Sequence, residues 1–187
     1  GGTFGVQQVP GCQPGRVDYI VVGGGGGGSR TGAGGGAGGM RYTREFIADA
    51  LTNACATGFP VSACTSYPVS IGGGGAGSDS DNSESSPGST TTFGPKSSTG
   101  GGGAAINSLE SGQFGKDGSQ GGGGGGAGEQ GDDYPSGSRN GGDGLFYPTA
   151  SLCGASVGES GTGPLGTGFY FAGGGAGAAP TGGCTGG

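Results

Sequence analysis

The sequence predicts a glycine-rich β fold in which short strands lead into packed, three-fold polyglycine II helices, with little α-helix. The first observation behind this prediction is that 58 of the 187 residues are glycine. The second is that an apolar strand, a glycine block and a polar loop follow one another repeatedly, at residues 17–28, 67–77, 89–104 and 168–178. The longest glycine runs are Gly23–Gly28, Gly72–Gly75, Gly100–Gly103 and Gly121–Gly126.

Polyglycine II is favoured because the other two conformations of a glycine-rich chain fit poorly. Disorder calls for low hydrophobicity together with high net charge, and here the net charge is only -6. Collagen needs glycine at every third position, a period that runs of six glycines break. Polyglycine II helices have three residues per turn and no internal hydrogen bonds, so their amides must pair with neighbouring helices. We therefore expect glycine wherever two such helices touch.

The predicted strands follow from β-branched and aromatic residues that stand before the glycine blocks. Val17–Val22 is the clearest of them, bounded by Pro14-Gly15 and the first run. Tyr67–Ile71 carries Pro68 near its start, where a missing amide donor is tolerated. Ser89–Phe93 is rich in threonine and is expected at a sheet edge. Residues 168–172 complete the set. They are the second of two aromatic segments, and the first, at 145–151, lies beside a polar loop.

One domain is expected over residues 1–187. Its parts are a lead-in at 1–15, a strand and glycine-helix body at 16–178 that contains a cysteine-bearing insertion at 42–66, and a Gly/Ala/Cys tail at 179–187. Within the insertion, Arg44–Ala54 has apolar residues at helical spacing. The alternative there is an irregular loop closed by a disulfide.

The cysteine pattern favours an oxidising, extracellular setting. The five cysteines show no CxxC spacing and the chain has no histidine, which argues against a zinc site. Cys55 and Cys64 close a short loop, and Cys153 with either Cys184 or Cys12 makes a second candidate disulfide. One cysteine is left over in either pairing.

Several functions are disfavoured by what the chain lacks. Its 7 basic residues are scattered singly, which does not suit a row of phosphates. No apolar stretch approaches the roughly 20 residues that span a bilayer. The glycine runs lack the βαβ context and the Gly-Lys-Ser/Thr sequence of nucleotide-binding loops. Without histidine there is no common catalytic triad. We therefore expect no catalytic residues, no cofactor and no nucleic-acid partner.

The candidate recognition residues lie in polar loops. Asp79, Asp81, Asn82 and Glu84 alternate acids with hydroxyl residues, a pattern that suits calcium; the loop lacks the central glycine and distal glutamate of an EF-hand, so a solvated acidic loop is favoured and no metal is expected. Tyrosine beside Asp, Ser and Asn is typical of adaptable recognition surfaces, although aromatic residues also cap helix ends. The second group of receptor-binding candidates is Asp132, Asp133, Tyr134, Phe146 and Tyr147.

The ordered segments resemble the glycine-rich domain found in phage tail fibres, including those of many marine cyanophages. Val17–Val22 followed by six glycines is similar to that family's entry strand, and Gly34–Gly39 followed by Met40-Arg41 resembles its closed glycine block. Its later segments are matched in order by Tyr67–Gly77, Gly88–Gly94, Ser98–Gly103 and Phe169–Gly175. The resemblance covers about residues 16–178 and departs from the family at Tyr42–Ser66, which is longer than a simple turn and carries cysteines.

The resemblance implies a polyglycine II sandwich in a surface fibre or adhesin. The function expected from it is a non-enzymatic, extracellular tail-fibre or adhesin domain whose variable loops contact a glycan or protein of the host cell surface. The alternative is a self-assembling subunit of an extracellular filament or appendage, in which glycine faces of several copies pair. A third possibility, ice binding, requires a regular Thr/Ala face, and the sequence shows only Thr90–Thr92.

Overall fold

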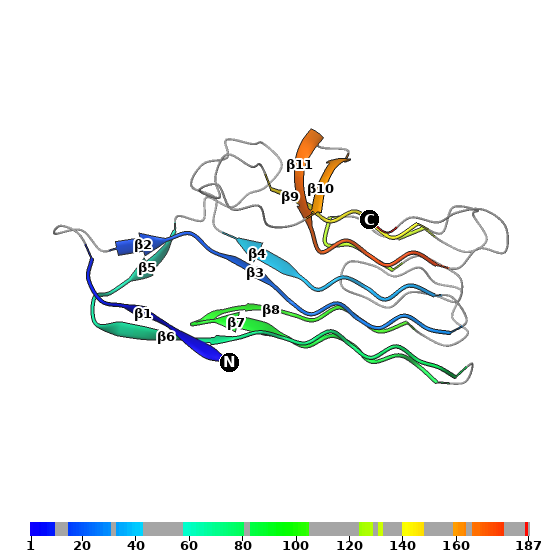
Figure 1. The fold of residues 1–187 in the computed structure, drawn as a ribbon, viewed down its shortest axis with the longest axis horizontal. Helices are drawn as coiled ribbons and strands as arrows, with labels where there is room; N and C mark the ends of the chain where they lie inside the picture. The colour runs from blue at the N-terminus through cyan, green and yellow to red at the C-terminus, as the bar shows by residue number, and fades with distance from the viewer. Residues whose placement is uncertain are drawn as a thin grey trace.

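The computed structural model describes residues 1–9, 15–30, 33–42, 58–80, 83–104, 124–128, 131–132, 140–147, 159–163, 166–177 and 186. The candidate helix at 44–54 lies outside these ranges. Within them the chain consists of strands, turns and extended glycine runs without a helix, so the expectation of little α-helix is confirmed for this part of the molecule. The strands gather toward one end, and the glycine runs project side by side from them (Figure 1).

The strands form small antiparallel sheets. Their bounds are β1 (Gly2–Val6), β2 (Gly15–Val17), β3 (Ile20–Val22), β4 (Met40–Tyr42), β5 (Phe59–Val61), β6 (Thr65–Ser70), β7 (Thr91–Phe93), β8 (Lys96–Ser98), β9 (Leu145–Tyr147), β10 (Glu159–Gly163) and β11 (Gly166–Phe171). The sheet orders are β1-β6-β7-β8, β10-β11-β9, β2-β5 and β3-β4.

Three features of the strand set differ from the sequence-based prediction. Ser89–Phe93, expected at a sheet edge, contributes β7, which lies between β6 and β8. The other two differences concern where strands begin and end. The expected strand Val17–Val22 is divided, because Val17 pairs with β5 whereas Ile20–Val22 pairs with β4. The lead-in, expected to be irregular, contains β1, which pairs with β6 over its full length. In both cases the partner strand, rather than local propensity, decides where a strand begins and ends.

An aromatic cluster holds the strand end together. Phe93 of β7 lies at its centre, with ring centroids 5.7 Å from Phe4, 6.0 Å from Tyr19, 5.4 Å from Phe59 and 6.3 Å from Tyr67. The Phe4 and Phe59 rings meet Phe93 edge to face, the arrangement that the ring quadrupoles favour. This cluster connects the four-stranded sheet to β5 and to the segment between β2 and β3.

The glycine run at 23–28 hydrogen-bonds to its neighbours with a period of three residues. One set of amides donates to the run at 33–39, in the pairs Gly23 to Gly39, Gly26 to Gly36 and Ser29 to Ala33. A second set donates to another run, in the pairs Gly24 to Ser89 and Gly27 to Ser86. The carbonyls repeat the spacing, with Gly24 and Gly27 accepting from Gly101 and Ala104, and Gly25 and Gly28 from Gly75 and Ser78. Consecutive residues thus reach different neighbours.

The closeness of neighbouring backbones, rather than backbone conformation, explains most of the glycine in these runs. The positive φ among the described glycines belongs to Gly94, in the turn between β7 and β8. A Cβ on Gly26 would lie 1.9 Å from the carbonyl oxygen of Gly102, where no side chain fits. A Cβ on Gly25 would meet only the carbonyl oxygen of Gly36, at 3.8 Å. Glycine is therefore required at some positions of the run, and at others a side chain would have space.

Ser85 supplies a buried polar connection between three runs. Its side chain is 7 % exposed, and its hydroxyl donates to the carbonyl of Gly27 at 2.6 Å while accepting from the amide of Ala104. Ala104 itself is fully buried. A small polar side chain is tolerated here because its buried hydroxyl finds both a backbone acceptor and a backbone donor.

Replacing Ser85 by alanine is expected to lower the free energy of unfolding by about 0.5–1.5 kcal/mol, because the substitution removes the hydrogen bonds of a buried hydroxyl while the amide of Ala104 stays bonded to the carbonyl of Gly27. Urea unfolding followed by circular dichroism measures the change. Ser86→Ala is the matched control, since Ser86 is exposed and its amide, not its side chain, bonds to Ala76. Equal losses in the two variants would contradict the role given to the Ser85 hydroxyl.

Candidate functional site

The turns that join the glycine runs lie away from the aromatic cluster, at the far end of the runs (Figure 1). One turn joins the runs 23–28 and 33–39, and a second joins the runs that end at Ser78 and begin near Glu84. The two turns lie against each other, because Ser29 and Ser78 form an isolated parallel β-bridge. The glycine runs carry few side chains, and the polar side chains are instead concentrated in these neighbouring turns.

The turn after Ser78 is organised by its own hydroxyl groups. The Ser78 Oγ lies 2.6 Å from the Ser83 Oγ, donates to the carbonyl of Ser80 and accepts from its amide. The guanidinium of Arg30, from the adjacent turn, donates to the carbonyl of Asp79 at 3.3 Å. The side chains of Asp79 and Glu84 are exposed. This end of the molecule thus offers carboxylates on an ordered backbone.

A further polar turn is closed by Asp132 and Asn140. The amide of Asp132 donates to the carbonyl of Asn140 at 3.0 Å, and the amide of Asn140 donates to the Asp132 carboxylate at 3.2 Å. The Asp132 side chain is half-buried. One of its carboxylate oxygens thus helps to fix the turn, and the receptor contact suggested by the sequence stays a prediction.

The remaining predicted contact residues are only partly placed. Asp81, Asn82, Asp133 and Tyr134 lie outside the described residues. Phe146 and Tyr147 were expected in or beside a polar loop, and the structure instead places their backbones in β9, opposite Tyr170 and Phe169 of β11.

Cys64 has an exposed free thiol in this structure, and the pairing with Cys55 stays a prediction because Cys55 lies outside the described residues. Its φ of 56° places it in the left-handed region, in the turn before β6. The Sγ atom points to the carbonyl of Gln7 at 3.8 Å. The other disulfide candidates, Cys55, Cys153 and Cys184, with the alternative partner Cys12, lie outside the described residues.

Across the part of the chain that the structure describes, no three His, Cys, Asp or Glu side chains gather closely enough to hold a metal ion. In the same residues there is no helix of the length and apolar character that a membrane crossing requires.

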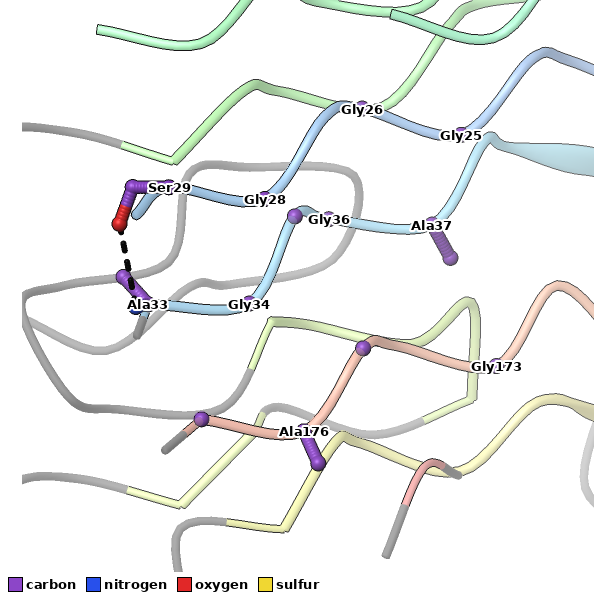
Figure 2. Close-up of a pocket in the computed structure, with 13 residues that line it drawn as sticks. Gly25, Gly26, Gly28, Ser29, Ala33, Gly34, Gly36, Ala37, Gly173 and Ala176 are labelled. Carbon is purple, nitrogen blue, oxygen red and sulfur yellow. Dashed lines mark hydrogen bonds between the residues drawn. The ribbon is translucent and has the colours of Figure 1, made fainter. Parts of the chain in front are cut away.

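A groove between glycine runs was not foreseen from the sequence. It has a volume of about 490 Å³ and lies between the runs 25–28 and 33–37 on one side and the run 173–177 on the other (Figure 2). Its lining consists of glycine, alanine and Ser29, whose hydroxyl accepts from the amide of Ala33 at 3.1 Å. The surface it offers is therefore mainly backbone amides and carbonyls.

A second cavity, of about 470 Å³, lies at the strand end beside β1 and β2. It combines valine side chains with Gln7, Gln8 and Arg16, whose guanidinium donates to the carbonyl of Gly58 at 2.9 Å. Gly15 is required beside it, because a Cβ there would lie 2.8 Å from a methyl group of Val9. This cavity could not be predicted from the sequence, because the pairing of β2 with β5 brings together residues that lie far apart along the chain.

Comparison with known families gives one match. The family model of the glycine-rich domain matches residues 1–187, so the chain belongs to the glycine-rich domain family. Neither a curated protein nor a solved structure matches it.

Proposed function

We propose that this member of the glycine-rich domain family is a non-enzymatic, extracellular fibre or adhesin domain, of the kind carried by phage tail fibres. Its rigid glycine scaffold presents variable loops to a host cell-surface glycan or protein. The observation that carries the proposal is the segregation of side chains: the runs are nearly bare backbone, and the exposed carboxylates of Asp79 and Glu84 stand on turns at their ends. Recognition by loops on a rigid frame is a common arrangement in binding proteins.

The scaffold in this proposal is an array of polyglycine II helices. The three-residue period of the hydrogen bonds supports this conformation, because a three-fold helix directs every third amide to the same neighbour. The need for glycine supports it as well, because it repeats every third residue: a Cβ has space at Gly25 and Gly28 but is excluded at Gly26. A two-residue period, as in a β-strand, would produce neither pattern.

Loop substitutions test the recognition function. The double variant Asp79→Ser, Glu84→Ser is expected to lower binding of the labelled domain to bacterial cells about tenfold or more, because it removes the exposed carboxylates while leaving the turn serines in place. The readout is titration of the domain against a panel of bacterial strains and a glycan array. The control is Ile71→Ser, which changes an apolar side chain that is 74 % exposed and outside the turns. Undiminished binding by the double variant would show that these carboxylates do not contact the receptor.

The second candidate function is that of a self-assembling subunit of an extracellular filament or appendage. The specific observation in its favour is the groove lined by glycine and alanine, since a scaffold that needed only to display loops has no use for it.

A further inference from the structure

Among the residues that the structure describes, only two of the three sets of amides in the run 23–28 have an acceptor. Amides at the first two positions of each triplet donate to the runs 33–39 and 86–89. The third set consists of Gly25 and Gly28, and within the described residues neither amide makes a hydrogen bond. Both residues are exposed and both line the groove. Two residues that line the groove, three apart in the sequence, therefore have amides without a described acceptor, at the spacing of the internal array.

The same wall of the groove offers an acceptor. The carbonyl of Gly26 accepts no hydrogen bond within the described part of the chain. In this array, backbone amides and carbonyls are paired between neighbouring runs. Amides and carbonyls that have no described partner therefore indicate where a further run could bind.

Steric demands inside the molecule do not explain why Gly25 and Gly28 are glycine. A Cβ on Gly28 would meet only the carbonyl oxygen of Ala33, at 3.4 Å, and one on Gly25 has still more space. At Gly23, Gly24, Gly26 and Gly27 a Cβ would instead lie within 1.9–2.1 Å of a carbonyl oxygen. The presence of glycine at Gly25 and Gly28 is explained if the backbone of another molecule packs against them. That backbone would approach as closely as the neighbouring runs approach the other glycines of this run.

The chain itself carries a run that fits this place. The run at 72–77 lies at the edge of the array, with Gly73, Gly74, Ala76 and Gly77 exposed. Gly74 and Gly77 are three residues apart, and within the described residues neither their amides nor their carbonyls are hydrogen-bonded. A Cβ on Gly73 would have no heavy atom within 4 Å. This edge run therefore has backbone donors and acceptors at the spacing that the groove presents.

We propose that the groove is an interface between copies of this chain, in which the edge run 72–77 of one copy lies against Gly25 and Gly28 of another. The inference rests on the proposed function, because it requires the scaffold of packed glycine runs. It identifies the partner in the second candidate function, the filament subunit, as another copy of the same chain. Backbone pairing supplies the affinity, as when an extended peptide adds to the open edge of a sheet. If the contact does not close between two copies, it repeats and builds a filament.

Oligomeric state tests the interface. Sedimentation of the full chain over a range of concentrations is expected to show a dimer or longer oligomer. Gly25→Gln and Gly28→Gln place a side chain in the groove at positions where a Cβ is sterically tolerated, and each is expected to weaken association about tenfold or more. Gly2→Gln is the matched control, because it creates the same residue at an exposed position of β1 where a Cβ meets nothing within 4 Å. Gly74→Gln tests the edge run in the same way.

A wild-type chain that stays monomeric at every concentration, or groove variants that associate like Gly2→Gln, would overturn the proposal. Circular dichroism of each variant distinguishes loss of the interface from loss of the fold. A variant that only fails to associate keeps the wild-type spectrum, whereas a variant that fails to fold does not. Binding to bacterial cells is measured on the same samples, so that loop recognition and self-association are judged separately.

Discussion

Replacing Gly26 by alanine is expected to prevent the protein from reaching its native fold. The added Cβ would lie 1.9 Å from the carbonyl oxygen of Gly102 and 2.5 Å from its carbonyl carbon. The obstacle is backbone rather than a movable side chain. Relief requires moving this run away from the run at 101–104, whose Gly101 and Ala104 amides donate to the carbonyls of Gly24 and Gly27. We expect a loss on the order of 4 kcal/mol or more, the range of exceptional single substitutions.

Gly25→Ala is the matched control for this prediction, because it makes the same chemical change one residue away. Its Cβ has space, and Gly25 is not among the glycines with positive φ. The substitution is expected to be neutral, or to stabilise by about 0.4–1 kcal/mol through lower entropy of the unfolded chain. Urea unfolding and amide hydrogen exchange measure both variants. Equal tolerance of alanine at the two positions would refute a three-residue period in the scaffold.

Replacing Phe93 by alanine is expected to lower the free energy of unfolding by about 3 kcal/mol, since the loss of a large aromatic group leaves a cavity that its neighbours fill only in part. Phe93 is the ring that Phe4, Tyr19, Phe59 and Tyr67 all contact. In a molecule with so little buried apolar side chain, the cluster carries an unusual share of the hydrophobic stabilisation. The urea midpoint, monitored by tyrosine fluorescence, reports the change.

Ile71→Ala serves as the control for the aromatic cluster. Ile71 is 74 % exposed, and its truncation is expected to change the free energy of unfolding by no more than about 0.5 kcal/mol. A similar loss for the two variants would mean that the cluster is not the hydrophobic core of the strand end.

The elements that sequence reasoning identified are those with a local signal. The step from strand to glycine run is visible at Ile20–Val22 and again at the end of β6, because β-branched residues stand directly before glycine. β1 gave no such signal, since Gly2 and Gly5 lower its β propensity, and it forms because β6 pairs with it. Similarly, Pro60 lowers the β propensity of Phe59–Val61, and β5 forms there because β2 pairs with it.

The candidate site divides along the same line. The exposure of Asp79 and Glu84 follows from a polar segment between two glycine runs and was predictable. The contact of Arg30 with the carbonyl of Asp79 was not, because it depends on two turns being neighbours in space. The groove was hidden for a related reason: its walls are runs far apart in the sequence, and every glycine looks alike until its neighbours are known.

The three-residue period of the runs has a consequence for how such a scaffold changes over evolutionary time. If the runs are the three-fold helices proposed above, deleting one residue turns every later residue of the run by about 120°, so that positions requiring glycine and positions tolerating a side chain exchange roles. A length change of three residues keeps the rotational phase and merely lengthens or shortens the array. Insertions and deletions in the runs are thus compatible with the fold mainly as triplets, whereas the turns at their ends accept any length.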